Sequence, residues 1–189
     1  MNHIRPALVS LVFLTLITGV VYPLVVTLIA QTIFPSQANG SMIIVNGKAV
    51  GSSLIGQAFS DPKYFWGRPS AAGKDGYDAS GSAGSNLGPT SKALIERITA
   101  DVDNLRAANG GGPVPIDLVT TSASGLDPDI SPAAAEYQVA RVAAARGVAA
   151  DAVRQAIARH TQQPTLGFLG EPRVNVLLLN LDLDGLISH

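Results

Sequence analysis

Residues 8–29 read LVSLVFLTLITGVVYPLVVTLI and contain no charged side chain. As an α-helix, this stretch reaches about 33 Å, which matches a membrane hydrocarbon core of about 30 Å. The chain of 189 residues is 47% hydrophobic and only 14% charged, so its apolar excess is concentrated here. The sequence therefore predicts a cytoplasmic tail over residues 1–7 and one transmembrane helix over residues 8–30.

The charges that flank this stretch predict its orientation. His3, Arg5 and the amino terminus precede it, whereas the next basic residue after it is Lys48. Positive charge stays on the cytoplasmic side, so we expect residues 31–189 to form one extracytoplasmic domain. The alternative is a signal peptide cut after the small-x-small sequence at residues 36–38. The apolar stretch is longer than the roughly 7–15 residues of the apolar region of a signal peptide, which favours the anchor but leaves cleavage there open.

Small residues and a proline recur at a four-residue spacing inside the span. Thr15, Gly19 and Pro23 fall on one helix face, and such a face lets another helix approach closely. Glycine and proline are also simply more frequent in membrane helices, and both interpretations stay open. Residues 8–29 contain no ionisable side chain, so this helix offers no group for ion coordination or proton relay.

The remaining residues predict a mixed architecture. Residues 41–50 indicate a β-hairpin turning at Asn46-Gly47, and residues 61–89 are rich in Gly, Ser, Asp and Pro, as is typical of a long ordered loop. We expect further strands at residues 54–59, 117–121 and 174–183, and helices at residues 91–109, 131–146 and 149–160. This order predicts an α+β or α/β domain with a small sheet covered by about three helices.

Composition excludes several classes of function. The formal net charge is −1 without a basic stripe, so the chain is not predicted to bind nucleic acid. There is no cysteine, which excludes disulfides and thiolate metal sites.

Patterns that resemble catalytic motifs are incomplete. Ser60 and Lys63 have the Ser-x-x-Lys spacing of penicillin-binding enzymes, but Pro62 lies between them and the partner motifs are missing. The glycines of residues 73–88 match neither phosphate-binding pattern, and we expect them in turns. His160 is the one histidine away from the termini, and we place it at a helix end, where the helix dipole favours it. The sequence predicts no catalytic residue, no metal site and no enzymatic activity.

Two pairs of acidic residues remain. Asp127 and Asp129 precede an expected helix, where negative charge is favourable. Asp182 and Asp184 should lie on one solvated face of the last expected strand. Neither pair supplies enough oxygen ligands for calcium.

An aromatic run precedes an arginine. Tyr64, Phe65, Trp66 and Arg68 fit ordinary core packing, with Arg68 stacked on a ring, better than a protein-contact patch. The contact patch is the alternative. The candidate interface residues are Tyr64, Phe65, Trp66, Arg68, Asp127 and Asp129.

Several segments, in order along nearly the whole chain, resemble the C subunit of the Kdp-type potassium-transporting P-type ATPase of bacteria and archaea. Besides the span, they are GSSLIGQAF (51–59), YFWGRPS (64–70), YDA (77–79), SNLGP (85–89), DLVTTSASGLDPDISP (117–132), QVARV (138–142) and GEPRVNVL (170–177).

The resemblance implies a subunit of a complex in the bacterial inner membrane that hydrolyses cytoplasmic ATP to drive potassium inward. Its partners would be a potassium-carrying A subunit, an ATP-hydrolysing B subunit and a small F subunit. ATP, Mg and K ions would be handled by those partners, and this chain would need no cofactor. The family is proposed to raise the ATP affinity of the B subunit; the expected topology favours indirect coupling. The alternatives from the residues alone are an anchored extracytoplasmic hydrolase and a stand-alone binding module.

Overall fold

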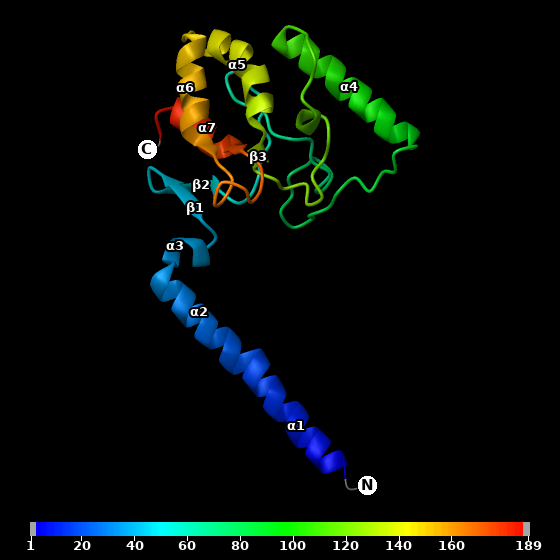
Figure 1. Cartoon of the computed structure of the whole chain (residues 1–189), viewed down its shortest axis with the longest axis vertical. Coiled ribbons are helices and arrows are strands. Elements are labelled where there is room, and N and C mark those ends of the chain that lie inside the picture. The colour runs from blue at the N-terminus through cyan, green and yellow to red at the C-terminus, as the bar shows by residue number, and fades with distance from the viewer. Residues whose placement is uncertain (1–2, 187–189) are drawn as a thin grey trace. The chain divides into compact units, whose positions relative to one another are not determined.

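The computed structural model describes residues 3–186. The chain divides into two compact units between Met42 and Ile43, which we call the N-terminal unit and the C-terminal domain (Figure 1).

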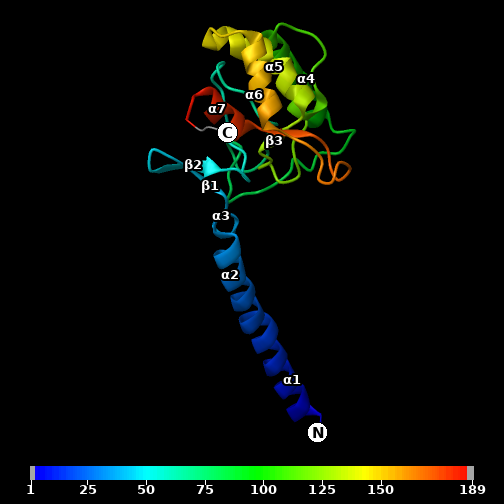
Figure 2. The ribbon, with the colours of Figure 1, turned by 60° about the vertical axis from the view of Figure 1, so that its left-hand side comes forward.

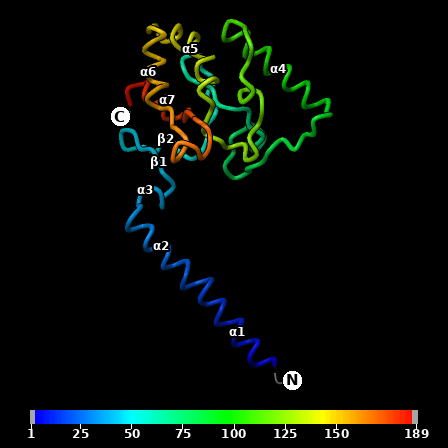
Figure 3. The backbone as a smooth tube through the Cα atoms, in the orientation of Figure 1, coloured from blue at the N-terminus to red at the C-terminus, as the bar shows by residue number. Residues whose placement is uncertain are grey.

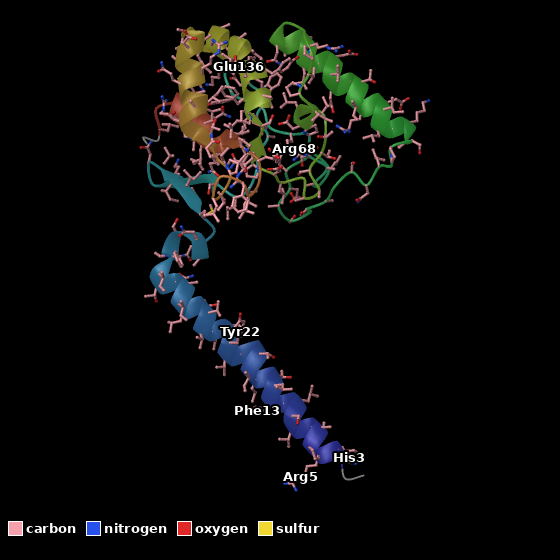
Figure 4. All side chains as sticks on the ribbon, viewed as in Figure 1. His3, Arg5, Phe13, Tyr22, Arg68 and Glu136 are labelled. Carbon is pink, nitrogen blue, oxygen red and sulfur yellow. The ribbon has the colours of Figure 1, made fainter. Side chains whose placement is uncertain are left out.

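The N-terminal unit is one long helix followed by a single turn. The long helix consists of α1 (Ile4–Leu16), the π-helical turn η1 (Ile17–Val21) and α2 (Tyr22–Ile33), and α3 (Pro35–Ala38) follows. Of the helices in residues 3–186, the helix Ile4–Ile33 alone is long and apolar enough to cross a membrane. Its side chains are exposed, as Phe13 and Tyr22 illustrate in Figure 4. The expected N-terminal apolar helix is confirmed, while its orientation stays a prediction.

Pro23 explains the π-helical turn. Proline has no backbone N–H, and its ring collides with the carbonyl four residues earlier in a regular helix, which here belongs to Gly19. Widening the preceding turn relieves that collision, and the Tyr22 N–H donates to the Ile17 carbonyl five residues back.

The C-terminal domain begins with the predicted hairpin. Its strands are β1 (Met42–Val45) and β2 (Lys48–Ser52). Asn46 and Gly47 both have positive φ angles, 50° and 76°, as a primed two-residue turn requires.

A second sheet has three short antiparallel strands. β5 (Arg173–Asn175) lies between β3 (Asp129–Ile130) and β4 (Thr161–Gln162). Val174 is opposite both Ile130 and Thr161. The long ordered loop predicted over residues 61–89 is confirmed, and its course is traced in Figure 3.

Three predicted helices are confirmed: α4 (Lys92–Asn109), α5 (Pro132–Arg146) and α6 (Ala150–His160). Local signals set their ends. Ser131 caps α5, since its Oγ accepts a hydrogen bond from the Ala134 N–H at 3.0 Å. Gly110 and Gly147 follow α4 and α5 in the left-handed conformation.

The core lies between the second sheet and helices α5, α6 and α7. α5 packs on α6, and α6 packs on α7 (Figure 1). Fully buried side chains include Phe65, Val139, Val142, Val153, Val174 and Leu179.

The strand predicted over residues 174–183 is wrong beyond its first two residues. The chain forms helix α7 (Val176–Leu183), and the Asn175 side chain caps it by accepting from the Leu178 N–H at 3.1 Å. Both faces of α7 are largely buried, with Leu177, Leu179 and Leu181 all enclosed. A short apolar run enclosed on all sides has no period that separates helix from strand.

Two shorter strand predictions are also wrong. Residues 117–121 begin in a 3-10 turn, η2 (Ile116–Leu118), and the Asp117 carboxylate accepts the Ser131 N–H at 2.8 Å. Residues 54–59 form no strand because Ser52 starts a turn there, accepting the Ile55 N–H on its carbonyl and the Leu54 N–H on Oγ. Over residues 3–186 the fold is α+β, with two small sheets instead of one.

Candidate functional site

The aromatic segment, defined as residues 64–68, is held by two buried side-chain amides. The Phe65 N–H donates to Asn180 Oδ1 at 2.8 Å, and the Phe65 carbonyl accepts from Asn180 Nδ2 at 3.0 Å. Trp66 makes the same pair with Gln138, at 2.8 and 3.1 Å. Gln138 and Asn180 are 0% and 2% exposed. Each amide thus satisfies both buried backbone groups of one residue, as a neighbouring strand would.

Arg141 supports the same segment from α5. Its guanidinium carbon lies 3.8 Å from the centroid of the Trp66 ring, and its Nη1 donates to the Pro62 and Tyr64 carbonyls at 2.6 and 2.9 Å. Burial lowers the pKa of Arg141 to about 10, so the side chain keeps its charge at neutral pH. The cation stacks on the one tryptophan of the chain and orders the backbone before it.

A second arginine of α5 anchors the tyrosine. Arg146 Nη2 lies 2.8 Å from Asp184 Oδ1, and the Tyr64 hydroxyl donates to the other oxygen of that carboxylate at 2.8 Å. Arg146 also donates to the Lys63 and Leu183 carbonyls. The expectation of a solvated Asp184 on a strand is wrong, because this residue follows the last residue of α7 and joins α5 to the aromatic segment.

Asp182 is likewise an internal partner. It lies on α7 with its side chain 13% exposed, and its Oδ2 is 2.8 Å from Arg159 Nη2 and 3.1 Å from Nε2 of the buried His160. Burial would raise its pKa, but hydrogen bonds from Arg159 and His160 outweigh burial and lower the pKa. The solvated-strand prediction for Asp182 is therefore wrong as well. His160 ends α6, as expected.

Arg68 fixes the far end of the aromatic segment (Figure 4). Its Nη1 lies 2.7 Å from Asp127 Oδ2, and its Nε donates to the Thr120 carbonyl at 3.3 Å. The predicted stacking of Arg68 on a ring is not what the structure shows; Arg141 takes that role on Trp66.

The Arg68 carbonyl accepts from the Tyr77 hydroxyl at 2.6 Å. Burial raises the pKa of Tyr77 to about 12, with a smaller contribution from Asp127, so this hydroxyl remains a donor.

Asp129 sits at the edge of the second sheet. Its Oδ2 is 3.0 Å from Arg173 Nε, and Asn175 Nδ2 donates to its Oδ1 at 3.3 Å. The pKa of Asp129 is raised, chiefly by burial and to a smaller extent by the charge of Asp127. The nearby Arg173 lowers this pKa but does not outweigh burial. A cavity of about 440 Å³ is lined by Arg68, Asp117, Asp127, Asp129, Glu171 and Arg173.

The structure thus brings the six candidate interface residues together in two adjoining groups. Phe65 is 0% exposed, so the domain itself covers its side chain. The other five candidates are partly exposed: Tyr64, Trp66, Arg68, Asp127 and Asp129. A partner interface at these residues stays a prediction.

Thr15, Gly19 and Pro23 lie on α1, η1 and α2 in turn. A methyl group added at Gly19 would meet no atom within 4 Å, so this face is open in the single chain. Packing against a partner helix stays a prediction too.

The residues with incomplete catalytic patterns lie in turns. Asp61 Oδ1 accepts the Lys63 N–H at 2.9 Å, and Lys63 Nζ lies 4.9 Å from the Tyr64 ring. Gly73 and Gly76 have positive φ angles in the long loop. Within residues 3–186, no three His, Asp or Glu side chains are grouped so that they could hold a metal ion.

Sequence reasoning missed the residues that organise this site. Gln138, Arg141 and Asn180 were not singled out, although polar residues at core positions of apolar helices are a usable signal, because burial demands that they be paired. Asn180 interrupts the run VLLLNLDL, and that interruption marks it.

Comparisons with known proteins agree on one family. The family model described as "K+-transporting ATPase, c chain" matches residues 4–185. The "Potassium-transporting ATPase KdpC subunit" of Sorangium cellulosum is 61% identical over 185 residues, which cover 97% of each chain. The proteins of the same name from Polaromonas naphthalenivorans and Herpetosiphon aurantiacus are 60% and 58% identical, over 98% and 97% of this chain and 95% and 96% of theirs.

The resemblance drawn from the sequence is therefore confirmed. The match includes the N-terminal helix, the aromatic segment, and the helices that hold that segment in place. The chain belongs to the family of KdpC subunits of potassium-transporting ATPases, and is an accessory subunit of a potassium pump.

Proposed function

We propose that this chain is a non-catalytic subunit that anchors in the membrane through residues 8–30 and holds the pump together through its C-terminal domain. The observation that carries the proposal is how the polar side chains of the site are used. Four of these side chains bind the chain's own backbone around the aromatic segment: Arg141, Arg146, Gln138 and Asn180. Their role is to build one rigid surface, which suits binding better than chemistry.

The proposed membrane topology places this domain outside the cytoplasm. The support is the charge distribution, with His3 and Arg5 at the start of the long helix (Figure 4) and no basic residue between its end and Lys48. In this arrangement the domain lies on the face of the pump opposite to cytoplasmic ATP. Any effect on ATP affinity is then indirect, through the subunits that this chain contacts.

We propose as partners a potassium-carrying A subunit, an ATP-hydrolysing B subunit and a small F subunit. ATP, Mg and K ions bind to those partners in this scheme, and the present chain contributes membrane and protein contacts alone.

The proposal is tested by comparing deletion of the whole domain with substitution of single polar residues. Removing residues 43–189 should abolish potassium transport, since the surface that holds the complex is gone. Ser60→Ala, Lys63→Ala and His160→Ala should each leave ATP turnover of the assembled pump within about a few-fold of wild type, because none would act on the reaction. ATPase assays on the complex purified in mild detergent measure turnover, and potassium uptake by cells that carry the truncated chain measures transport.

Two outcomes would contradict the proposal. One is a large loss of kcat from any of those substitutions in a complex that still assembles. The other is a full-length chain that purifies without large membrane partners, which is what an anchored hydrolase or a stand-alone binding module would do.

A further inference from the structure

The connection between β4 and β5 carries three large apolar side chains that are exposed, ahead of Glu171. Leu166, Phe168 and Leu169 are 79%, 74% and 51% exposed. We call residues 165–169 the apolar tip. The turn, drawn in orange, lies at the margin of the C-terminal domain in Figure 2. Residues 161–170 contain no charged side chain. Single exposed apolar residues are ordinary, but three on one short turn mark a contact surface.

Hydrogen bonds fix the geometry of the apolar tip. Thr165 and Leu169 form an antiparallel bridge, with N–H to carbonyl distances of 3.0 Å and 2.9 Å in the two directions. The Gly167 N–H also donates to the Pro164 carbonyl at 3.0 Å. Leu166 has a φ of 56°, a left-handed conformation that costs a leucine about 1–2 kcal/mol. The turn therefore presents these side chains in one fixed arrangement at an energetic cost.

The choice lies between lipid and protein as the surface that covers the tip. Proteins that bind an anionic bilayer surface combine apolar side chains with Lys, Arg, Trp or Tyr, and residues 161–170 have none of these. Lipid chains are also fluid and adapt to any shape, so a strained, fixed turn would bind them no more tightly than a flexible one. A protein pocket binds a turn of fixed shape more tightly, because side chains that are already ordered lose little entropy on binding.

We propose that the apolar tip inserts into an uncharged apolar pocket on a partner subunit of the pump, with Leu166 and Phe168 as the anchors. This rests on the proposed function as a subunit that holds the complex together. It adds which surface does so and what the partner must offer: a concave site without charge, because a charged group facing this tip would be buried without a partner.

The test uses the full chain and the pump purified without it. Leu166→Gly combined with Phe168→Ser removes both anchors, and it should raise the dissociation constant of the full chain for the rest of the pump at least about tenfold. Leu166→Gly alone relieves the left-handed strain, so it should leave the unfolding temperature unchanged or higher while still weakening binding. Ile116→Ser is the matched control, since Ile116 is 76% exposed outside the tip, and it should bind like wild type.

A fluorescence measurement distinguishes protein from lipid. Phe168→Trp, read against the background of Trp66, is reconstituted in phosphatidylethanolamine–phosphatidylglycerol vesicles with brominated acyl chains. The emission should shift to the blue only when the partner subunits are added, without quenching by bromine. Quenching in vesicles without partners would overturn the proposal in favour of lipid insertion.

The remaining outcomes separate this proposal from the proposed function. If the double variant binds like wild type while loss of residues 43–189 abolishes binding, the tip is not the contact, although the domain is. If loss of residues 43–189 leaves binding intact, the proposed function fails together with this inference. If Ile116→Ser weakens binding as much as the double variant, exposure alone explains the effect and the tip has no special role.

Discussion

At the scale of single residues, two neighbouring aspartates have different surroundings. Both carboxylates are paired, Asp127 with Arg68 at 2.7 Å and Asp129 with Arg173 at 3.0 Å, but burial raises the pKa of Asp129 above its ordinary value. A raised pKa in the folded state means that ionisation of Asp129 opposes folding, so the stability linked to this group is lost as pH rises through its pKa.

Asp129→Asn should therefore raise the unfolding temperature at pH 7, and the gain should shrink as pH falls from the raised pKa of Asp129 to its ordinary value of 3.8, below which it is lost. Thermal unfolding followed by circular dichroism between pH 3 and 8 measures this. Asp127→Asn is the matched comparison and should destabilise, since it leaves Arg68 without its carboxylate. Equal effects from the two substitutions would show that their surroundings do not differ as described.

Close packing around Tyr77 gives a second prediction at this scale. A methyl group at Gly56 would lie 2.5 Å from the Asp127 carbonyl oxygen and 2.6 Å from the Tyr77 ring. Gly56→Ala should cost about 1–3 kcal/mol, because backbone must move to admit the new atom. Gly88→Ala, where nothing lies within 4 Å, should be close to neutral. Urea unfolding of the two variants measures the difference, and a neutral Gly56→Ala would mean that the loops there can yield.

At the scale of elements, local chemistry was predictable and long-range pairing was not. The Asn46-Gly47 turn, the Ser131 cap and the glycines after α4 and α5 act on their immediate neighbours, so the sequence alone places them. The change from strand β5 to helix α7 was not predictable, because residues 176–183 are buried on all sides and their apolar pattern does not separate helix from strand. The site needs Gln138 and Asn180 to meet residues 72 and 115 positions away, which no spacing rule relates.

The amide pairs predict how tightly the aromatic segment is bound. Asn180→Ala leaves the buried N–H and carbonyl of Phe65 without partners, so it should cost about 2–4 kcal/mol. Glu136→Ala on the exposed side of α5 removes only a surface pair with Arg154 and should cost less than about 1 kcal/mol. Chemical unfolding gives both values, and hydrogen exchange at Phe65 should accelerate in Asn180→Ala alone. Similar costs would refute the strand-like role of the amide.

At the scale of the whole molecule, family membership and the long apolar helix Ile4–Ile33 describe a subunit of a membrane pump with a candidate membrane span. Its orientation is predicted from charge alone. A tag fused after His189, which lies outside the described residues, should be labelled from the extracytoplasmic side of intact cells. Labelling that requires lysis would reverse the topology and remove the argument against direct contact with ATP.

The open face of the long helix is testable in the assembled pump. Gly19→Leu should reduce recovery of the complex in mild detergent, because it fills the close-approach position, while insertion persists because leucine favours it. Val20→Leu, one residue further around the helix, is the matched control and should assemble normally. If the two variants are recovered equally, the Gly19 face points at lipid.

The wide turn at Ile17–Val21 also changes the phase of the helix. In a regular α-helix of 3.6 residues per turn, positions four apart drift steadily around the axis. A turn closed by hydrogen bonds over five residues holds more residues, so a step of four across it falls nearer one full rotation. Thr15, Gly19 and Pro23 then run almost parallel to the axis. A neighbouring helix can follow that line without coiling around it, and a substitution scan should show a periodicity that slips phase between Leu16 and Tyr22.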